Sequence, residues 1–228
     1  MNYNSRLLPS IAAVMAVATI ACGSPATPAD DIGDTPQEVI DSLVECSADL
    51  RLYELKGHVK DCTRKSFFNV VTTADGSFTV DSTGRDTLVA TAHFDIRGTY
   101  LPKKHERVRR DSAGRIVRWE DRRANVDNIP GGFLKDTIEY RYIDDNHLIS
   151  DGMGQYAVIV YDNDRKVVGQ YTVPRFNRVN TSAFNVYKAF DENGNWTERL
   201  TIWSTQGVND SLPHVSYSID RRIITYYK

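Results

Sequence analysis

Residues 189–199, with the sequence AFDENGNWTER, decide the fold class of this chain. At the first position of a turn, Asp191 can accept hydrogen bonds from backbone N–H groups, and Gly194 can take the positive φ that the return into a strand requires. Trp196 then stands where the next strand resumes. We therefore expect a β-hairpin here, with Gly194 in the left-handed region.

The same Asp-x-x-Gly turn pattern recurs along the chain. It is found at residues 81–84, 95–98 and 111–114, with degenerate forms at 144–147 and 162–165. Each copy is predicted to join two antiparallel strands, and the irregular spacing argues against a strict solenoid. The pattern therefore predicts an all-β fold, an antiparallel meander of repeated hairpins.

The segments between the turns have the alternation of half-buried strands. Ile138, Tyr140 and Tyr142 alternate with charged residues, and the apolar residues at 215, 217 and 219 alternate with polar ones. Residues 156–161 (YAVIVY) are apolar at every position, which is typical of a central strand covered on both faces. We expect this strand in the middle of the sheet.

One short helix is predicted before the strands begin. Thr35 is placed as its N-cap, Pro36 occupies the first helical position, and Glu38 completes a capping box. The apolar residues at 39, 40, 43 and 44 fall on one face. The helix is expected to end near residue 47 and to pack on the sheet.

The N-terminus has the pattern of a bacterial lipoprotein signal. Arg6 precedes an apolar run at residues 11–21, which is too short to span a bilayer and ends in the Ala21-Cys22 junction of a lipobox. We expect residues 1–21 to be a signal peptide, Cys22 to carry the lipid, and residues 22–34, rich in Pro, Ala, Gly and Asp, to be a flexible tether. Residues 35–228 are then a single β-sheet domain, anchored to the outer membrane and facing the periplasm or the outside.

Charge and cysteine content narrow the range of partners. The chain has 28 Lys plus Arg and 30 Asp plus Glu, so no global field favours nucleic acid, and the basic cluster at residues 103–110 is interpreted as a solvated hairpin. An oxidising envelope permits a disulfide between Cys46 and Cys62, and two separate buried thiols are the alternative.

Several motifs are similar to those of a known group. Residues 110–116 (RDSAGRI) resemble the tyrosine–aspartate (YD) repeat of Rhs-type proteins, in which a strand ends in Tyr-Asp, turns over Gly and resumes with Arg-Leu. Residues 189–199 and 220–227 resemble the closing unit of uncharacterised Bacteroidetes lipoproteins, and residues 55–60 (LKGHVK) resemble their opening strand. The resemblance covers about residues 55–228 and brings no known activity. It implies about six hairpin units, which form an open, curled sheet instead of the closed shell of the long Rhs proteins.

The sequence offers no catalytic constellation. It has no G-x-S-x-G elbow, and His93 and His147 fall beside turns or on strand edges, where surface histidines are common. Asp191, Asn193 and Asn195 match the first, third and fifth ligands of a calcium loop, but Gly falls at position 4 and Ile202 stands where Glu is required, so a β-turn is favoured. We predict no catalytic residue, metal site or cofactor.

Two kinds of surface site remain as hypotheses. Aromatic residues in predicted strands could form a stacking face for glycans or could fill the packed face of the sheet. These residues are Trp119, Tyr140, Tyr142, Trp196 and Trp203. Asp-Ser pairs at residues 111–112 and 210–211 fit a pattern of O-glycosylation in exported Bacteroidetes proteins, with Ser112 and Ser211 as the favoured positions.

The sequence therefore predicts a non-catalytic, lipid-anchored envelope protein with a binding or scaffolding role toward a glycan or a protein. The alternatives are an exported hydrolase acting on glycans or peptides, and an immunity-type protein that binds a toxin. An enzyme predicts a deep cleft with converging carboxylates or histidines, a glycan binder predicts an exposed aromatic groove, and a protein binder predicts a flat apolar patch.

Overall fold

The computed structural model describes residues 36–81, 87–121, 136–152, 155–174, 179–207 and 210–228. Within them, eleven antiparallel strands form one sheet, and two more form a separate hairpin, β2 (Val70–Thr72) with β3 (Phe78–Val80). The strands of the large sheet are β1 (Val59–Phe67), β4 (Thr87–His93), β5 (Glu106–Arg110), β6 (Ile116–Asp121), β7 (Asp136–Tyr142), β8 (His147–Gly152), β9 (Gln155–Tyr161), β10 (Val167–Pro174), β11 (Val179–Phe190), β12 (Trp196–Gly207) and β13 (His214–Tyr226).

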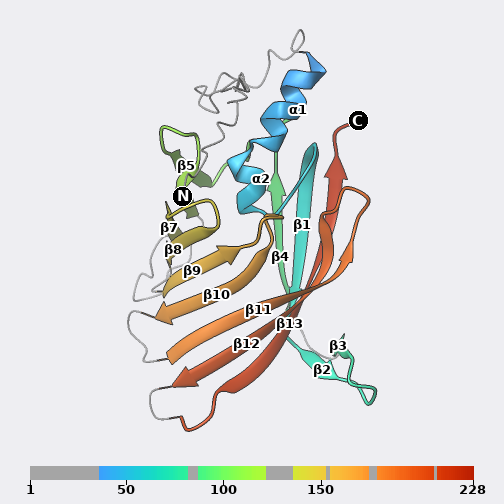
Figure 1. Ribbon diagram of the computed structural model, residues 1–228, viewed down its shortest axis with the longest axis vertical. Coiled ribbons are helices and arrows are strands. Elements are labelled where there is room, and N and C mark those ends of the chain that lie inside the picture. The colour runs from blue at the N-terminus through green and yellow to red at the C-terminus, as the bar shows by residue number, and fades with distance from the viewer. Residues whose placement is uncertain (1–35, 82–86, 122–135, 153–154, 175–178, 208–209) are drawn as a thin grey trace, which may run out of the picture.

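The order of the strands confirms the predicted open meander. Strands β5 to β13 are neighbours in chain order, β1 pairs with β13, and β4 pairs with β1, so β4 and β5 are the two edges of an unclosed sheet. Figure 1 shows both helices gathered at one end of the curled sheet, with β9 to β13 extending away from them.

The Asp-x-x-Gly segments at 95–98, 111–114 and 191–194 form the turns that the sequence predicts, whereas the copy at 81–84 extends outside the described residues. Asp191 Oδ1 accepts the N–H groups of Asn193 (3.0 Å) and Asn195 (2.9 Å), and Gly194 has φ 76°. Gly98 and Gly114 have nearly the same φ, at 78° and 77°. In the degenerate turn at 162–165, Arg165 takes φ 67° in place of glycine. The side chain of the leading Asp therefore sets the turn even where glycine is missing.

The two helices correct the predicted N-terminal boundary. Helix α1 (Gln37–Glu45) has Pro36 as its N-cap, with no side-chain cap bond, and ends before residue 47. Thr35, the predicted cap, lies outside the described residues. A second helix, α2 (Ala48–Leu52), follows at once because Ser47 accepts the Leu50 N–H as a side-chain cap. The sequence analysis missed this second helix.

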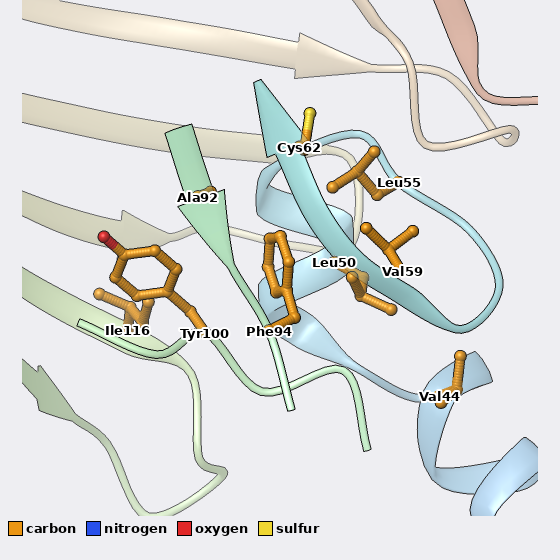
Figure 2. Packing of buried hydrophobic residues seen from close by; sticks show 9 residues of the cluster. All are labelled: Val44, Leu50, Leu55, Val59, Cys62, Ala92, Phe94, Tyr100 and Ile116. Carbon is orange, nitrogen blue, oxygen red and sulfur yellow. The ribbon is translucent and has the colours of Figure 1, made fainter. Parts of the chain in front are cut away.

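The face of the sheet that carries the helices is here called the inner face. Its hydrophobic core is shown in Figure 2 and consists of Val44, Leu50, Leu55, Val59, Cys62, Ala92, Phe94, Tyr100 and Ile116. Tyr53 stacks on Tyr100 with ring centroids 5.3 Å apart and meets Phe94 edge-on at the same distance. Residues 47–58, which we call the plug, supply Leu50 and Leu55 to this core, with Leu52 and Tyr53 packed against it.

Two strand predictions are wrong in part. β9 lies inside the sheet as expected, but only Ala157 and Tyr161 are buried among residues 156–161, so the strand is not covered on both faces. In β13 the polar residues Ser218, Asp220 and Arg222 are buried, whereas Val215 is exposed. The inner face of β13 is therefore polar from Ser218 to Arg222, because the plug brings charged partners to it, and apolar at Ile224.

Candidate functional site

The most heavily buried polar cluster begins at the end of α2. Leu55 N–H donates to the Leu50 carbonyl (2.8 Å) and Glu54 N–H to the Arg51 carbonyl (3.0 Å), which together form a Schellman motif. Glu54 occupies the position that is usually glycine and has φ 55°. A side chain at this strained position is tolerated because its carboxylate has several buried partners.

The Glu54 carboxylate is shared by four donors. Oε1 accepts from Tyr187 OH (2.6 Å) and from the Val167 backbone N–H (2.7 Å). Oε2 accepts from Arg199 Nη1 (2.9 Å) and Arg222 Nη2 (3.3 Å). Both oxygens are thus satisfied, and the plug is fixed to β10, β11, β12 and β13 at once.

Two partners of Glu54, Tyr187 and Arg199, belong to one row across the sheet. Tyr187, Arg199, Asp220 and Ser66 lie opposite one another on β11, β12, β13 and β1. Asp220 Oδ2 accepts from Arg199 Nη2 (2.7 Å), and Asp220 also accepts from the Ser66 hydroxyl. We call these four residues, with Glu54 and Arg222, the charged row. Two carboxylates face two guanidinium groups there, so the buried charges balance.

Trp196 covers the charged row as an aromatic lid. The Arg222 guanidinium carbon lies 3.4 Å from the ring centroid of Trp196, and that of Arg199 lies 4.4 Å from it. Trp196 is 1% exposed. Arg222 also donates to the carbonyls of Tyr53 (2.8 Å) and Glu54 (3.1 Å). The indole therefore stabilises buried cations and presents no stacking surface to solvent.

The electrostatics of the charged row follow from burial and pairing. Burial acts to raise the pKa of Asp220, but the Arg199 charge and the hydrogen bonds from Ser66 and Arg199 outweigh it, so the pKa lies below its ordinary value. Burial lowers the pKa of Arg222 to about 10, which still leaves the group charged at neutral pH. For Tyr187, burial and the Glu54 carboxylate raise the pKa. These shifts keep Asp220 and Arg222 in their charged forms at neutral pH.

The hairpin that decides the fold is tied to the same plug. Asn195 is 1% exposed, its Oδ1 accepts the Lys56 N–H (2.7 Å), and its Nδ2 donates to the Lys56 carbonyl (2.9 Å). Nδ2 also donates to Tyr226 OH (2.8 Å), which in turn donates to Asp191. These side chains have protein partners, which supports the turn over the calcium loop.

A second plug contact anchors the far side of the sheet. Arg110 binds Asp49 through two hydrogen bonds of 2.8 and 2.7 Å, and Asp49 is 3% exposed. The Tyr100 N–H also donates to Asp49 (2.7 Å). The prediction that residues 103–110 form a solvated cluster is therefore wrong for Arg110, because its guanidinium is part of a structural ion pair.

The five predicted aromatic residues do not form a glycan-binding groove. Trp119 and Tyr140 pack against the core. Tyr142 donates to the Ile116 carbonyl (3.0 Å) and lies under the Arg115 guanidinium. Trp203 is partly buried, and its Nε1 donates to Ser218 Oγ (3.0 Å). Together with Trp196 they lie on the inner face, where packing and capping use them.

The remaining predicted positions are separated in space. The disulfide considered for Cys46 and Cys62 is absent, and so is the alternative of two buried thiols, because Cys46 is exposed and Cys62 is buried in β1. Ser112 and Ser211 both lie on exposed turns or loops. Cys22, the signal peptide and the tether lie outside the described residues.

His93 of β4 and His147 of β8 each pair with a single carboxylate. His93 Nδ1 lies 2.7 Å from Asp61 Oδ1, and His147 Nδ1 lies 2.8 Å from Asp144 Oδ1. No group of three metal-ligating side chains occurs in the part of the chain that the structure describes.

A shallow hollow is lined by residues 210–214, which lie in one stretch of the chain. Among the described residues, no helix has the length and apolar character needed to cross a membrane.

The opposite side of the sheet, the outer face, carries apolar side chains in three adjacent rows. Register places Tyr217, Ile202, Phe184, Gly169 and Val160 in one row across β13, β12, β11, β10 and β9. The rows on either side contribute apolar residues from the same strands and from β8. We call the set the outer apolar face: Ile149, Val158, Val160, Tyr171, Phe184, Val186, Leu200, Ile202, Val215, Tyr217 and Ile219.

Part of the outer apolar face is open to solvent, whereas Ile149, Leu200 and Ile219 within it are buried. Phe184 is 50% exposed, Tyr171 48% and Val186 39%. The β2–β3 hairpin covers one end, where the Phe78 ring lies 4.7 Å from that of Tyr217. An exposed, contiguous apolar surface of this kind marks an interaction site more often than a scatter of single residues does.

Comparison of the chain with protein-family models, curated proteins and solved structures gave no match. The resemblance to Rhs-type lipoproteins therefore stays a prediction. Sequence reasoning missed the charged row, although Asp220-Arg-Arg222 in the middle of a strand was a signal for it. It also missed the outer apolar face, because the alternation in β13 does not show which set of residues faces the plug.

Proposed function

We propose that the chain is a non-catalytic, lipid-anchored component of the bacterial cell envelope that binds a folded protein partner through the outer apolar face. The observation that carries this proposal is that Tyr171, Phe184 and Val186 are about half-exposed. They lie side by side on the outer apolar face, whose side chains form three adjacent rows across the sheet. Large aromatic and aliphatic side chains at the centre of a patch are the usual source of binding energy between proteins.

The border of the outer apolar face supports a protein partner over an anionic lipid surface. Arg221 pairs with Glu198 (2.8 Å) on one side, and Arg118 pairs with Glu139 (3.2 Å) on the other. These cations are neutralised by neighbouring carboxylates, so they add little attraction toward phosphate headgroups. An apolar centre with a mixed polar border is the composition of protein interfaces. A toxin bound by an immunity-type protein would be one partner of this chemistry.

The test places a photoreactive benzoylphenylalanine at Phe184 in cells, with Val71 of β2, which is 46% exposed, as the matched control. A discrete protein adduct is expected at residue 184 and not at residue 71. The purified partner should then bind Phe184→Asp at least about tenfold more weakly than Val71→Asp, since a central anchor contributes more than about 1 kcal/mol. Adducts with lipid only, equal adducts at both positions, or unchanged affinity of Phe184→Asp would overturn the proposal.

A further inference from the structure

The two edge strands of the open sheet, β4 and β5, differ in the charge of their side chains. The β5 edge has the sequence ERVRR, so pairing with a copy of itself about Val108 would bring Arg107 opposite Arg109. Charged edge strands of this kind resist pairing with other chains. The β4 edge has the sequence TLVATAH and no Asp, Glu, Lys or Arg.

The described end of β4 is also exposed where an edge strand would pair. Residues 87–90 are all exposed, and Leu88 and Val89 are 54% and 55% exposed although they point to opposite faces of the sheet. The far end is covered, because Leu101 N–H donates to the His93 carbonyl (2.8 Å) and Phe94 bridges to Tyr100. The open stretch is therefore residues 87–91.

Two backbone hydrogen bonds fix which backbone groups of this stretch face outward. Phe94 N–H donates to the Lys60 carbonyl (2.9 Å), toward β1, whereas the His93 carbonyl faces away from β1 to meet Leu101. Backbone groups alternate in direction along an antiparallel strand. The N–H and C=O groups of Thr87, Val89 and Thr91 thus point away from β1, toward the outside of the sheet.

We propose that two copies of this chain associate by antiparallel pairing of their β4 strands, centred on Val89. This register places Val89 opposite its symmetry mate and Thr87 opposite Thr91, so each outward-facing residue meets another. No like charges meet, in contrast to β5, and the exposed Leu88 and Val89 side chains gain apolar neighbours. A two-fold axis closes the contact, so the product is a dimer with one continuous sheet of twenty-two strands, twice the eleven of one copy.

The first test measures the mass of the full chain in detergent by light scattering, corrected for bound detergent. The parent is expected to be a dimer, and Val89→Lys should raise the dimer dissociation constant at least about tenfold because it places two cations opposite each other. Val71→Lys, at a valine of β2 that is 46% exposed against 55% for Val89, should leave the dimer intact. A monomeric parent, or equal effects of the two variants, would overturn the proposal.

The second test fixes the register and does not depend on a destabilising substitution. In a Cys22→Ala, Cys46→Ser background, Val89→Cys should form an intermolecular disulfide on mild oxidation. The Cα atoms of such a hydrogen-bonded pair are about 5.5 Å apart, within the range that a disulfide spans. Val71→Cys should not cross-link. Cross-linking at neither position, or at residue 71 alone, contradicts β4 pairing. Neither test involves the outer apolar face, so their failure would leave the proposed function standing.

Discussion

Substitutions of Glu54 distinguish two opposing contributions to the free energy of unfolding. The strained backbone at this position lowers stability, and the buried carboxylate raises it. Its φ of 55° costs about 1 kcal/mol relative to glycine at the same position. Its carboxylate holds Arg199 and Arg222, which are each 8% exposed. Removing one partner of a buried ion pair costs about 3–5 kcal/mol, because the remaining charge keeps its desolvation penalty without compensation.

Two substitutions at this position give different expected losses. In Glu54→Gln the amide must place N–H groups either toward the guanidinium donors at Oε2 or toward Val167 N–H and Tyr187 OH at Oε1. Because Asp220 still pairs with Arg199, the expected loss is about 3 kcal/mol, at the lower end of the range. Glu54→Gly loses the same pairs but regains about 1 kcal/mol of backbone strain, so it should lose about 2 kcal/mol.

The assay is urea unfolding followed by tryptophan fluorescence, with Arg165→Gly as the matched control. Arg165 also has a positive φ, 67°, but its side chain makes a surface hydrogen bond to the Glu45 carbonyl. Relief of strain and loss of that bond should nearly cancel, so its stability should stay within about 1 kcal/mol of the parent. The reasoning is refuted if Glu54→Gly is as stable as the parent, or if Glu54→Gln loses less than about 0.5 kcal/mol.

Four further predictions can be checked independently. Gly194→Ala should lose about 1 kcal/mol in urea unfolding, from its positive φ alone, whereas Gly98→Ala should lose more because the new Cβ would lie 2.6 Å from Leu50 Cδ1; equal losses would contradict this packing. The pKa of Asp220 is lowered in the folded state, so its contribution to stability is present above the unfolded pKa of about 3.9 and is lost as pH falls through the folded value. Between pH 5 and pH 2, the free energy of unfolding in urea should therefore fall more steeply for the parent than for Asp220→Asn. Parallel pH profiles of the two proteins would argue against this role of Asp220. Cys22→Ala should leave the membrane fraction, and its continued membrane association together with a parent mass that lacks acyl chains would exclude lipidation. Intact-mass measurement of the native protein should show glycan at Ser112 or Ser211, which both lie on exposed turns or loops, and the mass of the lipidated polypeptide alone would count against it.

The sequence by itself determined the hairpins and the open meander. The turns depend on contacts within four or five residues, such as Asp191 Oδ1 with the backbone of Asn193 and Asn195, and these contacts are set by local residue identity. Four of the connections, β5 to β6, β7 to β8, β9 to β10 and β11 to β12, are turns of this kind, so the pairing of these neighbouring strands follows from the turns. This is also why the positive φ of Gly194 could be predicted from its position in the motif.

Only the tertiary structure decided which face of each strand is buried and against what. Alternation in β13 separates Val215, Tyr217 and Ile219 from Ser218 and Asp220, but a period of two treats both faces alike. Contact with the plug determines which face is buried, because Glu54 brings a carboxylate to the face that carries Arg199 and Arg222. These two residues are 145 and 168 positions away from Glu54 in the chain. A buried charge is stable only where its counter-charge arrives, so the polar side of β13 faces inward and the apolar side, with exposed Val215 and buried Ile219, faces outward.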